Sequence, residues 1–166
     1  KNNKLIGYLT KEQSITYNMI KNNLKNTIIT YECENNKYLS FEVISNKSKI
    51  TTKNKEIKID INISGTINES SCNFKLNNDK SIKKLENILN IYLKNNITKN
   101  IDDIRKKYNS DIFGFLDIIY KHDYKTYLEV KDNWYEKTFK NIKININPKI
   151  NIIAKGNVME GTNEKN

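Results

Sequence analysis

The sequence has few of the residues on which enzymes and metal sites most often depend. Its 166 residues include one histidine (His122), one arginine (Arg105), two cysteines, one proline and five glycines scattered singly. No glycine-rich phosphate loop, GxSxG nucleophile motif or HExxH zinc motif occurs. The sequence therefore predicts a non-enzymatic protein, and we expect neither a cofactor nor a metal ion.

The remaining candidates for acid–base chemistry are poorly placed. His122 lies in KHDYK at the predicted end of a helix, where a solvated or capping histidine is more common than a general base. Asp102 and Asp103 are adjacent, so their side chains point about 100° apart on a helix. Neither arrangement makes a convincing acid–base pair.

The two cysteines, Cys33 and Cys72, are far apart and lack the spacing of metal ligands. A free cysteine is often a small buried hydrophobic residue, and a chain of this length does not need a disulfide to fold. The sequence leaves open whether the two are bonded to each other.

Long hydrophobic runs are also missing. No apolar run approaches the roughly 18 residues of a membrane span, and no signal peptide is recognisable. The chain begins at Lys1 rather than methionine, so we expect a piece of a longer protein. We expect one domain over residues 1–158 and a polar disordered tail over 159–166.

Lysine, isoleucine and asparagine make up about half of the chain. All three have AT-rich codons, so a low-GC genome explains much of this bias. The net charge of +10 still favours an anionic partner, which could be a nucleic acid, an acidic lipid surface or an acidic protein. The lysines are dispersed and arginine is almost absent, so we expect no nucleic-acid partner. A basic module that binds nucleic acid or an anionic membrane is kept as the alternative function.

The first half of the chain predicts a strand, a helix and a block of strands. KLIGYLT (4–10) predicts a short strand with Gly7 at a bulge or close approach, and Thr10 can cap a helix over 11–24. Apolar residues alternate on both sides of the ENNK turn, which predicts a hairpin over 29–43. A long, half-buried antiparallel strand is predicted by five isoleucines of one parity: Ile57, Ile59, Ile61, Ile63 and Ile67.

The second half is mainly helical. A helical stripe begins at Asp79, a candidate N-cap, and runs for some 28 residues. Residues 110–123 predict a short helix, and residues 124–139 predict a third helix in which Leu128 and Trp134 face inward.

The chain closes with a predicted strand over residues 141–156, and Pro148 within it argues for an edge strand or a bulge. The predicted order is therefore β-α-β-β-β-α-α-α-β. This order is typical of an α+β fold in which helices pack mainly on one face of an antiparallel sheet.

The stretch SDIFGF (110–115) places a glycine between two phenylalanines, directly after Ser110 and Asp111. Ser110 and Asp111 are expected to cap a helix. Gly114 would cost that helix about 1 kcal/mol relative to alanine, so we expect another backbone to approach too closely for a Cβ. Phe113 could serve a partner if its ring faces outward.

DIFGF, with the lysine-rich helix before it and KDNW after it, resembles the C-terminal domain of the Ger(x)C family, the C subunits of bacterial spore nutrient germinant receptors. KLIGYLTKEQS is similar to the family's opening strand, and SKITTKNKEIKIDINISGTINE to its long hairpin. The similarity covers nearly the whole chain; Ser110, where alanine is common, is a departure that a helix cap explains. The motif residues, which we expect to be chiefly structural, are Ser110, Asp111, Ile112, Phe113, Gly114, Phe115 and Trp134.

The resemblance implies a lipoprotein on the outer surface of the spore inner membrane that works with two membrane subunits, A and B, in germination signalling. The lipid-bearing cysteine of such a protein would lie upstream, so neither Cys33 nor Cys72 is expected to carry the lipid. No catalytic activity is attributed to the family, in agreement with the missing catalytic motifs.

Overall fold

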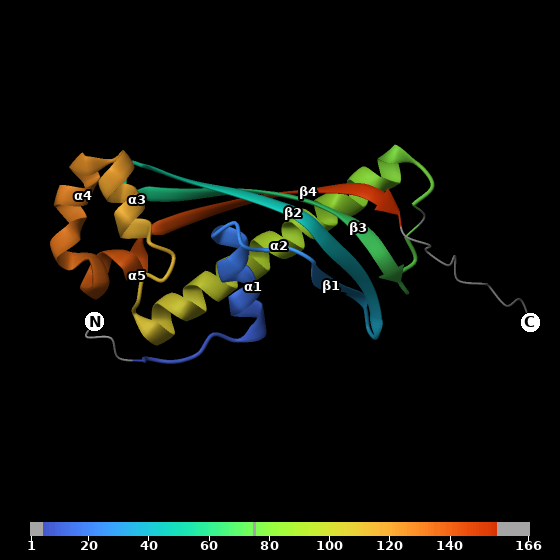
Figure 1. Cartoon of the computed structure of the whole chain (residues 1–166), viewed down its shortest axis with the longest axis horizontal. Helices are drawn as coiled ribbons and strands as arrows, with labels where there is room; N and C mark the ends of the chain where they lie inside the picture. Colours follow the sequence, from blue (N-terminus) through green and yellow to red (C-terminus); the bar gives the residue numbers. More distant parts are fainter. Residues whose placement is uncertain (1–4, 75, 156–166) are drawn as a thin grey trace, which may run out of the picture.

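A computed structural model describes residues 5–74 and 76–155 of the chain (Figure 1). A 3-10 turn (Lys131–Asn133) and a π turn (Trp134–Thr138) lie between the last two helices. The helices and strands are, in chain order, α1 (Lys11–Ile20), β1 (Thr27–Glu34), β2 (Lys37–Lys53), β3 (Glu56–Ser70), α2 (Asp79–Tyr108), α3 (Phe115–His122), α4 (Tyr124–Val130), α5 (Phe139–Asn141) and β4 (Lys143–Lys155). The predicted tail over 159–166 lies outside the described residues.

The four strands form one sheet in the order β1-β2-β3-β4, and the α+β class is confirmed. The first three strands are antiparallel as predicted, whereas β4 runs parallel to β3. The reason is the length of α2: its 30 residues span about 45 Å, close to the length of a 15-residue strand. The chain is thus carried back to the start of β3 before β4 begins.

The predicted isoleucine row of β3 forms the centre of the core. Its five members are each at most 1% exposed. Helices α1 and α2 both bury their apolar sides against this face, and α2 crosses the strands obliquely (Figure 1). The opposite parity of β3 points to solvent, so the prediction that helices cover mainly one face is confirmed.

Helix α2 is continuous, and its cap lies one residue earlier than expected. The side chain of Asn78, rather than Asp79, accepts a hydrogen bond from the backbone of Ser81 at 2.9 Å. In α1, the predicted cap is present, since Thr10 and Gln13 form a reciprocal capping box.

Residues 5–9 do not form the predicted first strand. They run in an extended conformation beside the C-terminal end of α2, where the Tyr108 hydroxyl donates to the carbonyl of Tyr8. A Cβ on Gly7 would lie 2.3 Å from the Tyr108 ring. The close approach predicted at Gly7 is therefore present, but its neighbour is an aromatic side chain and not a strand.

The free edge of β4 is covered by polar side chains of α2. The backbone N–H groups of Ile150 and Ile152 point away from β3 and donate to Asn90 (2.7 Å) and Glu86 (2.9 Å). Pro148 belongs to the same outward row, where a missing N–H costs no bond within the sheet. The prediction of an edge strand at Pro148 is confirmed.

The helical segment after α3 departs from the prediction in one side chain. Residues 124–141 follow a helical path that changes from α to 3-10 to π and back. Trp134 is fully buried as expected, but Leu128 is 49% exposed. Leu128 lies two residues from each of the buried residues of α4, Thr126 and Val130, which places it about 200° around the helix from both and therefore on the solvent side.

A bulge in β2 between Val43 and Ser45 changes which of its residues face the helices. Beyond the bulge, Asn46 and Ser48 point inward and both donate to the carbonyl of Met19 at the end of α1, at 2.8 and 2.7 Å. At the same place, a Cβ on Gly65 would lie 2.0 Å from the carbonyl oxygen of Glu42. The bulge therefore requires a glycine on the neighbouring strand.

Replacing Gly65 by alanine should destabilise the domain, because the backbone of β2 cannot move away without breaking the ladder. We expect a loss of roughly 1–3 kcal/mol in the free energy of unfolding, measured by urea denaturation. The control is Ser64→Ala on the solvent face, which should change the stability by less than about 0.5 kcal/mol. Equal stability of the two variants would contradict the close approach.

Candidate functional site

The SDIFGF stretch forms a turn that enters α3, and α3 begins at Phe115 rather than at residue 110. The carboxylate of Asp111 accepts hydrogen bonds from the backbone N–H groups of Phe115 (3.0 Å) and Leu116 (2.8 Å). Asp111 thus caps the first turn of the helix, as the sequence indicated. The Ser110 side chain makes no hydrogen bond with any of the described residues, so it does not act as a second cap.

Gly114 adopts the left-handed backbone region, with φ of 74°. A Cβ at this position would have no heavy atom within 4 Å among the described residues. The expected close approach of another backbone is therefore wrong. The glycine is favoured by its backbone conformation, since other residues rarely adopt a positive φ.

The Asp111 carboxylate is largely shielded from water. Burial raises its pKa, while hydrogen bonds from the backbones of Leu116, Phe115 and Gly114 and the nearby indole of Trp134 oppose that rise. The indole nitrogen of Trp134 is buried and has no well-formed hydrogen bond among the described residues. Its approach to Asp111 is therefore an electrostatic contact rather than a regular hydrogen bond.

The aromatic motif residues form one buried cluster with rings from α1 and α5. Phe113 stacks on Phe115 with ring centroids 5.2 Å apart, and the Tyr17 ring lies 6.1 Å from Phe113. Phe139 joins Phe115 at 6.5 Å and Trp134 at 5.6 Å. Phe113 is fully buried, so its ring is not available to a partner.

The motif therefore joins the helices at one end of the sheet. Lys21 donates to the carbonyl of Phe113 at 3.4 Å, and Ile112 packs against the core at its margin. The structural role of the seven motif residues remains a prediction, which substitution at Gly114 can test.

The sequence did not single out the role of Arg105. Its guanidinium is mostly buried, donates to the carbonyl of Ile142 at 2.8 Å and forms an ion pair with Asp102. Arg105 thereby joins α2 to the start of β4. One arginine in a chain whose other 28 basic residues are lysines was itself a signal, because arginine makes several directed hydrogen bonds at once.

The structure brings no catalytic constellation together in the described part of the chain. His122 is exposed at the end of α3, and Asp103 lies on the outer side of α2. Among the described residues, no group of three or more His, Cys, Asp or Glu side chains could hold a metal ion.

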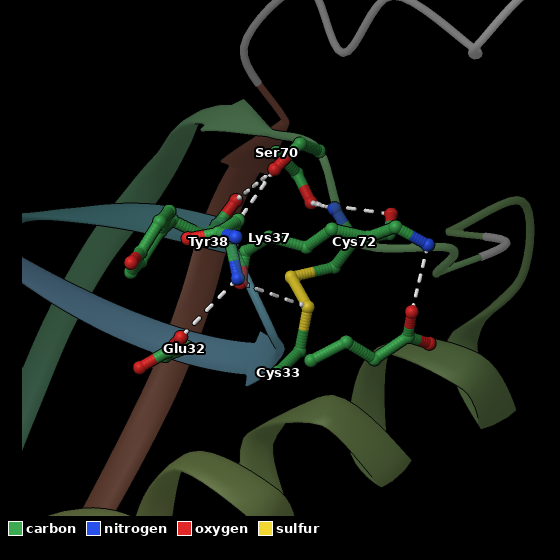
Figure 2. The surroundings of a disulfide bond; sticks show 9 residues. Glu32, Cys33, Lys37, Tyr38, Ser70 and Cys72 are labelled. Atoms are coloured by element: carbon green, nitrogen blue, oxygen red, sulfur yellow. Dashed lines mark hydrogen bonds and ion pairs between the residues drawn. A yellow bond between two sulfur atoms is a disulfide. The ribbon is translucent and has the colours of Figure 1, made fainter.

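A disulfide joins the far end of β1 to the segment after β3 (Figure 2). Cys33 and Cys72 are separated by 39 positions, and their Cα atoms lie 6.1 Å apart. Beside the bond, the backbone N–H of Tyr38 donates to the Ser71 hydroxyl at 2.8 Å, and the backbone N–H and hydroxyl of Ser71 donate to the Tyr38 carbonyl at 2.9 and 3.2 Å. The two cysteines, whose pairing the sequence left open, are thus bonded to each other. The bond fixes the segment just before α2 to the β1–β2 hairpin.

The helical end of the molecule presents a group of exposed tyrosines. Tyr120 and Tyr124 are 52% and 56% exposed, and both lie against Tyr127, with centroid separations of 4.9 and 5.8 Å. The exposed Leu128 follows directly in α4. We call Tyr120, Tyr124, Tyr127 and Leu128 the tyrosine surface.

A hollow of about 180 Å³ lies between α1, β1 and α2. Apolar side chains such as Ile15 and Ile97 line it together with Thr16 and Asn100. The amide of Asn100 already donates to the Thr16 hydroxyl at 2.9 Å. Lys11, Glu12 and Asn96 also line the hollow, so its wall is mixed in character.

Removing the disulfide should destabilise the domain by about 4 kcal/mol, because the closed loop restricts the unfolded chain. The variant Cys33→Ser/Cys72→Ser can be compared with the wild type by thermal denaturation, with and without dithiothreitol. We expect the reductant to lower the stability of the wild type only. A reductant effect of the same size on the double variant would contradict the assignment.

Substitution at Gly114 distinguishes backbone strain from steric exclusion. Gly114→Val should destabilise the domain by roughly 1–2 kcal/mol, because a branched side chain resists the left-handed region. Gly114→Asn should retain most of the stability, since asparagine tolerates that region and the space is open. Equal losses for the two variants in urea denaturation would contradict the conformational explanation.

No helix among residues 5–74 and 76–155 is long and apolar enough to cross a membrane.

Comparison with known proteins identifies the family. The family described as "Spore germination B3/ GerAC like, C-terminal" matches residues 1–156. The crystal structure of the GerBC protein has the same fold, with a TM-score of 0.72 and 20% sequence identity. The match covers 92% of this chain and 48% of GerBC, so the chain spans about half of that protein. No curated protein matches the sequence. Since the family match covers nearly the whole chain, the protein belongs to the Spore germination B3/GerAC-like C-terminal family.

Proposed function

We propose that this domain is a non-enzymatic part of the C subunit of a spore nutrient germinant receptor and acts through contacts with the A and B subunits. Membership of the spore germination family supports the receptor role. The tyrosine surface is the observation that carries the proposed contacts. Tyrosine is enriched among the residues that dominate binding energy at protein interfaces.

The location of the tyrosine surface suits a partner contact. It lies on α3 and α4, at the end of the sheet that is distant from the disulfide (Figure 1). Its rings are already held by one another, at centroid separations of 4.9 to 5.8 Å. A partner would therefore pay a reduced entropy cost for ordering these side chains.

We further propose that the domain lies outside the cytoplasm, on the outer surface of the spore inner membrane, with a lipid anchor outside this chain. The Cys33–Cys72 bond supports this location, because disulfides persist in oxidising compartments and are rare in the cytosol.

The test uses full-length parent protein in spores, with Tyr120→Ser and Tyr124→Ser introduced together. Both side chains are more than half exposed, so we expect normal folding and normal abundance on an immunoblot of the spore membranes. We expect at least a several-fold slower germination in response to the nutrient and reduced recovery of the partner subunits in pull-down. The cause is the loss of aromatic contact area.

The matched control replaces two exposed apolar residues elsewhere, Tyr38→Ser and Ile91→Ser, and should germinate normally. A third strain carries the parent protein without this domain. Normal germination of that strain would refute the receptor role. Loss of germination in that strain, together with a normal response of the tyrosine variant, would refute only the assigned surface.

A further inference from the structure

The helix-free face of the sheet carries an array of lysines at the end near α3 and α4. Beyond the β2 bulge, the outward positions of β2, β3 and β4 all face solvent. We define the lysine face as the exposed residues Lys47, Lys49, Lys53, Lys58, Lys143 and Lys149.

The strand register places these lysines in two dimensions. Lys47 on β2 and Lys149 on β4 lie opposite the same residue of β3, Asn62. They are therefore two strand spacings apart, about 10 Å. This distance is comparable to the screening length of about 8 Å at physiological salt, so the charges act on a partner together.

The acidic residues on this face do not neutralise it. Glu56 pairs with Lys143 at 2.8 Å, and Asp60 pairs with Lys58 at 2.9 Å. Hydrogen bonds from these two lysines are the leading causes that hold the pKa of each carboxyl below its ordinary value. Six lysines against two carboxylates leave a surplus of four positive charges.

The chemistry of the lysine face discriminates among anionic partners. The face contains no arginine and no aromatic ring, so it offers neither the planar fork that reads guanine nor a platform on which bases stack. It also lacks the apolar centre of a stable protein interface. Lysine is a compact point charge that attracts anionic headgroups without demanding a fixed geometry.

We propose that the lysine face is a docking surface for an anionic lipid bilayer. The array spreads over the outer side of three neighbouring strands and is therefore an open surface, although Lys143 also borders a hollow between α2 and the start of β4. The inference rests on charge and geometry, and it stands whether or not the domain serves a germinant receptor.

The experiment measures binding of the 166-residue chain to phosphatidylcholine vesicles with and without phosphatidylserine, by flotation at an ionic strength of about 0.15 M. The test variant carries Lys47→Gln, Lys49→Gln, Lys53→Gln and Lys149→Gln. These four lysines form no ion pair among the described residues, so the variant should fold normally.

The control removes the same charge from the opposite side of the molecule, through Lys83→Gln, Lys84→Gln, Lys94→Gln and Lys99→Gln on α2. Each variant lowers the net charge from +10 to +6, since four lysines are lost. We expect the wild type to bind only the anionic vesicles. The test variant should bind them at least tenfold more weakly, because each lysine near the surface contributes about fivefold.

The affinity of the control variant for anionic vesicles should fall by no more than about threefold, because its lost charges act on the bilayer only at long range. Equal losses in both variants, or equal binding of the wild type to neutral vesicles, would overturn the proposal. A duplex DNA of mixed sequence forms the last arm. If the wild type binds the duplex more tightly than anionic vesicles, and only the test variant loses this binding, the lysine face would be assigned to nucleic acid. That outcome would also overturn the proposal.

Discussion

Burial of the isoleucine row on one face of β3 is the constraint on which the rest of the structure depends. Five isoleucines of one parity, from Ile57 to Ile67, give a long apolar surface, and a long element is needed to cover it. Burying each side chain contributes about 1.5–3 kcal/mol, so the row is a major source of stability. The 30-residue helix α2 and the shorter α1 provide that cover, and the solvent face of the sheet is left to polar side chains.

The helical end of the domain depends on a second, local constraint. Asp111 satisfies the first N–H groups of α3, and the left-handed Gly114 turns the chain so that Phe113 and Phe115 stack. The cluster then closes on Trp134. One short motif thus combines a cap, a left-handed backbone conformation and a ring contact.

Helices and strands with a sustained period of apolar residues could be predicted from the sequence. The alternating isoleucines of β3 and the helical stripe of α2 each directly report which side is buried. Isolated features were less predictable. A glycine such as Gly114 can indicate either a close contact or a positive φ, and only the backbone conformation distinguishes the two explanations. The Cys33–Cys72 bond depends on strand register, and the direction of β4 depends on the length of the helix before it. Leu128 was misplaced because the buried side of the short helix α4 is set by Thr126 and Val130, and Leu128 lies opposite both.

The position of β4 has a consequence for the biogenesis of the protein. This strand is the last element of the described residues, yet it pairs with β3 along nearly its whole length. A nascent chain that ends before residue 143 would therefore present an open, hydrogen-bonding edge of the central strand beside an incompletely covered apolar face. Such an intermediate is prone to aggregation, and the sheet gains its protection only when β4 has been added.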